Sequence, residues 1–169
     1  MSMKPGIRKF ALTVHITSSV GWFGAVVAYL AVAVVTQTNH DAQMVRAYFA
    51  LDLITRYVLV PLAFASLLTG LVMSFGTAWG LFRHYWVIFK LILTTLSTIV
   101  LLGFTQTMSY MVGAASDPAT SIADLRALGA GKEHAIAALV VLIVNTLLSV
   151  YKPRGLTRYG WRKQQENRK

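Results

Sequence analysis

Cysteine and charge are both scarce in this sequence. The chain of 169 residues contains no cysteine, which excludes disulfides, thiolate metal sites and cysteine nucleophiles. Charged residues make up 13% of the chain, whereas a soluble domain averages about 25%. A composition this poor in charge argues against a soluble domain.

Charge is also missing from long continuous segments. Four segments contain no Asp, Glu, Lys or Arg: 10–40, 57–82, 91–116 and 134–151. A helix needs about 20 residues to cross a bilayer, and the shortest segment would still rise about 27 Å as a helix. Surface helices of a soluble protein carry a charged, solvated face. The sequence therefore predicts four transmembrane helices.

The turn residues between these segments predict how the helices connect. Gly76 and Gly80 frame a short turn, so the helices on either side should be antiparallel neighbours. Pro61 predicts a kink near residues 57–61, and Ser121 with Asp124 resembles a capping box that begins a short surface helix. The predicted fold is an all-α, antiparallel up-down-up-down bundle over residues 1–151, followed by a basic tail, 152–169. We expect the long helices at about 8–36, 42–76, 83–112 and 132–151.

The basic residues predict the orientation of the bundle, because cytoplasmic loops carry an excess of Lys and Arg. One side has three basic residues: Arg46, Arg126 and Lys132. The other side has eleven: Lys4, Arg8, Lys9, Arg83, Lys152, Arg154, Arg158, Arg162, Lys163, Arg168 and Lys169. Both termini are therefore expected in the cytoplasm.

The net charge of +10 lies next to apolar spans. This placement favours anionic lipid headgroups as the partner of the basic tail rather than nucleic acid. The first apolar segment is too long for the core of a cleaved signal peptide. We expect a multi-pass protein of the bacterial cytoplasmic (inner) membrane, and the sequence leaves open a homodimer or a larger membrane complex.

Ionisable residues at membrane depth are costly, so each one suggests a function. Asp52 and Arg56 are four residues apart and can form an ion pair on one helix face. A structural pair near the outer interface is the favoured interpretation, and a gate or anion-binding element is the alternative. Tyr48, Tyr57 and Tyr110 are expected beside them as interface aromatics.

A polar stripe on the third helix begins at Lys90, whose long side chain can also reach the headgroups. The stripe is expected to face the bundle interior, where small hydroxyls hydrogen-bond neighbouring helices. Asn145 on the fourth helix is expected to do the same. The stripe comprises Lys90, Thr94, Ser97, Thr98, Thr105 and Ser109.

Histidines offer a different chemistry. His15 shares a face of the first helix with Ser18 and Ser19, and it is either a hydrogen-bonded interior residue or a ligand. A bis-histidine haem needs two ligands at similar depth on facing helices. His15 with His84 is the candidate pair near the inner side, and His40 with His134 is the pair near the outer side. No phosphate loop, zinc-protease or serine-hydrolase motif is present.

Several short motifs resemble those of known membrane families. They are His15, Trp22 and Gly24 in the first helix, Leu68-Thr69-Gly70-Leu71 in the second, Trp86, Lys90 and Leu91 in the third, and the ending from Tyr151 to Gly160. Over nearly the whole chain the sequence resembles small four-pass bacterial integral membrane proteins of actinobacterial type. More distantly it is similar to copper resistance protein D-like and HemJ-like families. The resemblance to the HemJ-like families implies that His15 is a candidate haem ligand and that Lys90 lies close to that site.

Three functional hypotheses follow. The first is a small transporter-like or accessory membrane component, with Ser19, Thr94, Ser97 and Asn145 lining the interior; no enzymatic activity is required for it. The second is a membrane protein of electron transfer or haem metabolism that binds haem b or a porphyrin. The third is a copper-handling protein, for which histidines and the methionines Met73 and Met108 could offer ligands, although the sequence contains no cluster of methionines.

Overall fold

The computed structural model describes residues 3–38, 41–76 and 80–166, and these are helical over most of their length. Four of the long helical segments are apolar and long enough to cross a membrane. The predicted all-α class is confirmed. The helices are α1 (Pro5–Thr38), α2 (Asp41–Ile54), η1 (Thr55–Leu59), α3 (Val60–Gly76), α4 (Tyr85–Ser116), α5 (Ile122–Ala127), η2 (Gly129–Gly131), α6 (Lys132–Tyr151) and α7 (Arg158–Glu166).

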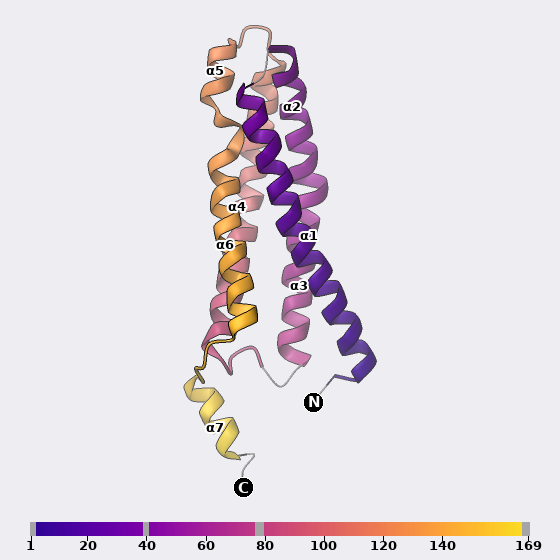
Figure 1. Ribbon diagram of the computed structural model, residues 1–169, viewed down its shortest axis with the longest axis vertical. Helices are drawn as coiled ribbons and strands as arrows, with labels where there is room; N and C mark the ends of the chain where they lie inside the picture. The colour runs from indigo at the N-terminus through magenta and orange to yellow at the C-terminus, as the bar shows by residue number, and fades with distance from the viewer. Residues whose placement is uncertain (1–2, 39–40, 77–79, 167–169) are drawn as a thin grey trace.

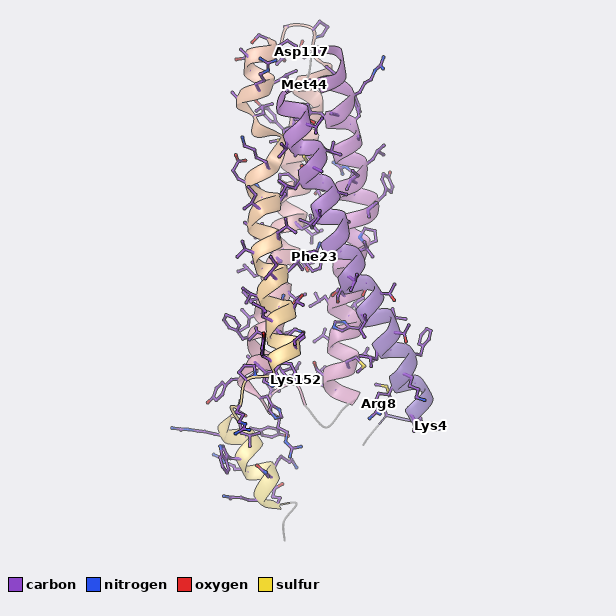
Figure 2. All side chains as sticks on the ribbon, viewed as in Figure 1. Lys4, Arg8, Phe23, Met44, Asp117 and Lys152 are labelled. Atoms are coloured by element: carbon purple, nitrogen blue, oxygen red, sulfur yellow. The ribbon has the colours of Figure 1, made fainter. Side chains whose placement is uncertain are left out.

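The long helices alternate in direction (Figure 1), and their contacts close a ring. Among the described residues, α1 packs on α3, α3 on α4, α4 on α6 and α6 on α1, while α3 and α6 barely meet across the ring. Lys4, Arg8 and Lys152 lie at one end of the bundle and Asp117 lies at the other (Figure 2). We call these the inner and outer ends, after the predicted orientation.

The second span is interrupted by a turn of π-helix, η1, just before Pro61. Val60 donates its backbone N–H to the carbonyl of Thr55, five residues back. A proline has no N–H, and its ring clashes with the carbonyl four residues earlier. Pro61 therefore disfavours the α-helical bond to Tyr57, and a wider turn takes up the strain. Such turns add one residue to a helix without ending it.

The buried apolar core lies mainly in the outer half of the bundle. Tyr29 and Tyr48 are almost fully buried there, with 2% and 0% of their surface exposed. Tyr29 donates to the carbonyl of Ala130 at 3.0 Å, and Tyr48 donates to the carbonyl of Leu125 at 2.7 Å. The expectation that Tyr48 lies at the membrane interface is therefore wrong, because its hydroxyl caps the α5 segment from within, whereas Tyr57 and Tyr110 are exposed. Other members of this core are Ala33, Met44, Leu51, Phe104, Met108, Met111 and Ala115.

The loop between α4 and α6 contains the short helix α5. The Ser121 hydroxyl accepts the backbone N–H of Asp124 at 3.2 Å and donates to its carboxylate at 2.6 Å. A left-handed turn follows, with φ of 51° at Ala130 and 69° at Gly131. A Cβ on Gly131 would lie 2.3 Å from the Phe104 ring, so this position needs glycine for space as well as for conformation.

The basic tail is folded against the inner end of the bundle. The Thr157 hydroxyl donates to the carbonyl of Phe82 at 2.6 Å, and its backbone N–H donates to the carbonyl of Arg83 at 3.1 Å. Thr157 also caps α7 by accepting the N–H of Gly160 at 3.0 Å. Gly160 is buried so closely that an added Cβ would lie 2.3 Å from the carbonyl oxygen of Arg83. The tail is therefore part of the folded unit.

Candidate functional site: a polar cluster in the inner half of the bundle

Polar side chains from α1, α3, α4 and α6 gather in the inner half of the bundle. We call this set the inner polar cluster. Hydrogen bonds between its side chains join α1 to α3 and α4 to α6. The cluster comprises His15, Ser19, Ser66, Thr69, Lys90, Thr94, Asn145 and Ser149.

On the α1–α3 side, His15 and Thr69 define the chemistry. His15 Nδ1 lies 3.0 Å from Thr69 Oγ1, and the Thr69 hydroxyl donates its only proton to the carbonyl of Ala65 at 2.5 Å. Thr69 must therefore accept a proton from Nδ1–H, which leaves the Nε2 lone pair of His15 available. Gly70 allows this close approach, because a Cβ there would lie 3.2 Å from the imidazole.

A second bond on this side joins Ser19 to Ser66, whose hydroxyl oxygens are 2.8 Å apart. Ser66 is 6% exposed, so this pair lies inside the helix contact. Sequence reasoning identified Ser19 but missed Ser66. The only signal for Ser66 was its spacing of three residues from Thr69 on one helix face.

On the α4–α6 side, Lys90 donates to the hydroxyl of Ser149 near the inner end of α6. Ser149 in turn donates to the carbonyl of Asn145 at 2.9 Å. Thr94 donates to the carbonyl of Lys90 at 2.8 Å, so its oxygen accepts the Asn145 amide N–H at 3.2 Å. Each hydroxyl thus has a fixed direction of donation, and the ammonium of Lys90 keeps two protons for other partners.

Among the described residues, Asn145 has the one buried polar side-chain atom that lacks a hydrogen-bond partner. The residue is 8% exposed, and its Oδ1 is a buried oxygen without a hydrogen-bond donor. Buried polar atoms in folded proteins nearly always have a partner. Turning the amide would place Oδ1 against the Thr94 oxygen, whose proton is donated to the carbonyl of Lys90. The site is therefore suited to a group that donates a hydrogen bond to Asn145.

The two sides of the cluster belong to neighbouring helix pairs, since α1 packs on α6 and α3 packs on α4. Among the described residues, no side-chain hydrogen bond joins the α1–α3 side to the α4–α6 side in the inner half, and Lys90 has no ion-pair partner. The inner parts of these helices contain no Asp or Glu. The electrostatic character of the cluster is therefore positive.

The other histidines lie apart from this cluster. His84 precedes α4 and forms a backbone bridge with Leu156 of the tail. His134 is at the opposite end of the bundle, exposed and stacked on Phe104 with ring centroids 4.7 Å apart. His40 falls outside the described residues. The structure thus places Lys90 at Ser149 and His15 at Thr69, both in the inner half of the bundle, and it places His84 with the tail.

The polar stripe of α4 divides between two sites. Ser97 is half-buried and makes no hydrogen bond through its side chain within the described chain, while Thr105 and Ser109 contact Arg56. The expectation that the whole stripe faces one interior is wrong for these last two residues. Successive helix residues differ by about 100°, so a stripe read in steps of four drifts around the helix.

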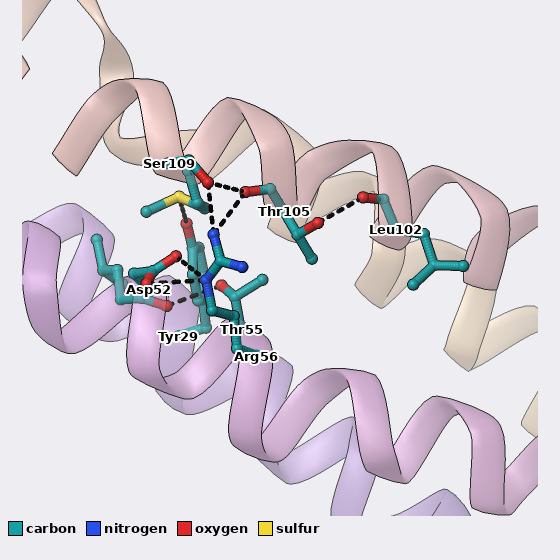
Figure 3. A network of polar contacts seen from close by, with 9 residues as sticks. Tyr29, Asp52, Thr55, Arg56, Leu102, Thr105 and Ser109 are labelled. Atoms are coloured by element: carbon teal, nitrogen blue, oxygen red, sulfur yellow. Dashed lines mark hydrogen bonds and ion pairs between the residues drawn. The ribbon is translucent and has the colours of Figure 1, made fainter. Parts of the chain in front are cut away.

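Asp52 and Arg56 form an ion pair in the outer half, next to the π turn (Figure 3). Arg56 Nε lies 2.8 and 3.0 Å from the two carboxylate oxygens of Asp52. Arg56 Nη2 donates to the carbonyl of Thr105 at 3.2 Å and to the hydroxyl of Ser109 at 2.5 Å. The pair therefore fastens α2 and η1 to α4, which is a structural role, and its side chains stay partly exposed.

No group of three or more His, Cys, Asp or Glu side chains that could hold a metal ion is present in the parts of the chain that the structure describes. Met108 is buried in the outer core, where its sulfur lies 3.3 Å from the Tyr29 hydroxyl oxygen. Comparison with protein-family models, with curated proteins and with solved structures gives no match to this chain. The site must therefore be interpreted from its own geometry.

Proposed function

We propose that this is a small, transporter-like multi-pass protein of the bacterial cytoplasmic membrane, and that the inner polar cluster receives a small polar anion from the cytoplasm. The observation that carries the proposal is the placement of Lys90 in the inner half of the bundle, bonded to Ser149 and without a carboxylate partner among the described residues. Ionisable groups at membrane depth commonly mark a solute pathway.

The free hydrogen-bonding groups support the same solute class. Lys90 retains two N–H donors for an anionic group, and Asn145 Oδ1 waits for a donor. A small anion that also carries a hydroxyl or an amine would meet both requirements. The packed core around Tyr29 and Met108 lies between the cluster and the outer end, so access would be from the inner end.

The absence of native cysteine allows a direct test. Ser97→Cys introduces a single thiol farther along α4 than Lys90, and Leu96→Cys places one on the adjacent exposed position. In inside-out vesicles, a membrane-impermeant methanethiosulfonate should modify Ser97→Cys and leave Leu96→Cys unmodified. An anionic reagent should react severalfold faster than a cationic one, and Lys90→Gln should remove that preference. Equal, slow reaction at both positions would contradict the proposal.

Binding of haem b or a porphyrin is the second candidate, and one specific contact favours it. His15 of the first helix motif lies against Thr69 and Gly70 of the second. His15 is the position at which the resemblance to the HemJ-like families implies a haem ligand. A ligating histidine typically donates its other N–H to a neighbouring oxygen, as His15 does to Thr69.

Absorption spectroscopy separates the two candidates. The protein purified in mild detergent, with and without added haemin, should show a Soret band if haem binds, and His15→Ala should abolish that band. A His134→Ala variant is the matched control, because His134 lies at the opposite end of the bundle. A colourless protein that takes up no haemin would exclude this second candidate and leave the first untouched.

A further inference from the structure

A groove lies on the outside of the bundle at its inner end, separate from the inner polar cluster. It runs between the start of α4, the end of α6 and the chain that follows α6, and its volume is about 420 Å³. This is within the range of roughly 300–1,000 Å³ typical of small-molecule sites. Its walls include Trp86, Phe89, Ile92, Leu148, Pro153 and Arg154.

The groove exists because the tail is docked. Tyr85 donates its backbone N–H to the carbonyl of Gly155 at 3.3 Å, which holds Pro153–Gly155 beside the start of α4. The bonds of Thr157 to Phe82 and Arg83 and the close packing of Gly160 fix the next residues. The chain after α6 therefore forms one wall of the groove.

The chemistry of the lining changes along the groove. Phe89 and Ile92 are about half exposed and present apolar surface where the bilayer would lie. Tyr85 and Trp86 are aromatics of the kind that sit at the headgroup level. Arg154 is exposed, and it is the only charged residue among the lining residues described. An occupant that matches both ends has an apolar chain and an anionic head.

We propose that this groove binds one anionic membrane phospholipid, with an acyl chain against Phe89 and Ile92 and the phosphate at Arg154. The basic helix α7 continues directly from this wall, with Tyr159 and Trp161 exposed. Cations next to a membrane surface attract anionic lipids, each by a modest amount. Because the tail is docked, Arg154 attracts the lipid at one position, the edge of the groove.

Lipid titration followed by native mass spectrometry tests the proposal. Detergent-solubilised protein is titrated with phosphatidylglycerol and with phosphatidylcholine that carry identical acyl chains. We expect one phosphatidylglycerol to bind with preference, and Arg154→Gln to weaken its binding about fivefold, the effect of one cation beside an anionic lipid. Arg8→Gln removes an exposed cation at the inner end of α1, and it should leave the preference unchanged.

A second variant separates the groove from a merely basic tail. Gly160→Ala keeps every charge but forces a Cβ against the carbonyl of Arg83, so it should undock the tail and abolish the preference. The far-ultraviolet circular dichroism of this variant should remain that of the folded bundle. Equal binding of the two lipids, an equal loss in Arg8→Gln, or a full preference in Gly160→Ala would each overturn the proposal.

Discussion

At the scale of single residues, the direction of each hydroxyl decides which groups remain free. Thr94 and Ser149 both donate to backbone carbonyls of their own helices. They therefore accept hydrogen bonds from Asn145 and Lys90. As a result, Oδ1 of Asn145 receives no proton and two protons of Lys90 remain undonated. Deleting a polar group that already lacks a partner should differ from deleting one that satisfies a buried carbonyl.

Asn145→Leu tests the first case. The substitution replaces a buried amide, whose oxygen has no donor, by an apolar side chain of similar size. It removes that unpartnered oxygen, and the Thr94 hydroxyl keeps its bond to the carbonyl of Lys90, so the midpoint of thermal unfolding in detergent should stay nearly constant. Selective modification of Ser97→Cys by the anionic reagent should fall in the same variant. A clear loss of thermal stability would show that Asn145 has a mainly structural role.

Tyr29→Phe tests the second case. The change leaves the buried carbonyl of Ala130 without its donor, which should lower the free energy of unfolding by about 1–3 kcal/mol. Denaturant titration in detergent, followed by tryptophan fluorescence, measures this loss. Tyr57→Phe is the control, because Tyr57 is 73% exposed, and a loss of similar size there would contradict the explanation.

Spacing predicts contacts within one helix far better than contacts between helices. The four-residue separation of Asp52 and Arg56 is enough to place both side chains on one face. It contains no information on Ser109, which lies on another helix and also binds Arg56. Tyr48 shows the same limit, since its burial depends on how the α5 segment folds over it.

At the scale of elements, the irregularity predicted from Pro61 is a π turn in the second span. Arg56 within the turn Thr55–Leu59 contacts α4, and Thr69 beyond the turn contacts α1. The extra residue of a π turn preserves the helix faces on both sides of it. The sequence could not distinguish this outcome from a simple bend, because both relieve the clash at Pro61.

Single-residue deletions test this interpretation. Deletion of the exposed Val58 should return η1 to a regular helix and leave the faces of α2 and α3 nearly unchanged. The protein should therefore still fold, with a lower unfolding midpoint because a regular turn restores the clash of Pro61. Deletion of the exposed Phe64 in the regular part of α3 should rotate the residues on one side of it by about 100°. That rotation would separate Thr69 from His15. Size-exclusion profiles and thermal unfolding in detergent would compare the two, and equal damage from both would refute the interpretation.

At the scale of the whole molecule, orientation remains a prediction from the uneven distribution of basic residues. The structure adds that the clustered cations Lys4, Arg8 and Lys152 lie at one end of the bundle (Figure 2). A cytoplasm-dependent fluorescent reporter fused after Lys169 should be active, and a periplasm-dependent phosphatase at the same position should be inactive. The opposite pair of activities would reverse the assignment of inner and outer ends.

Composition was sufficient to predict the number of long apolar helices and the all-α class. Uncharged segments of this length cross a bilayer as helices, which satisfy their own backbone hydrogen bonds. The ring order and the docked tail could not be predicted in the same way. They depend on contacts such as Lys90 with Ser149 and Thr157 with Phe82, between residues that are far apart in the sequence. The sequence offers each hydroxyl in those contacts several possible partners, and only the packing of the helices selects one.

The uneven distribution of the apolar core has a mechanical consequence. The outer half is held together by packing around Tyr29, Tyr48 and Met108, whereas toward the inner end α1 and α3 diverge from α4 and α6 (Figure 1). Within each of those two arms, side-chain hydrogen bonds keep the helices together. A rigid-body movement of these arms about the packed outer half would therefore be widest at the inner end, where Lys90 lies.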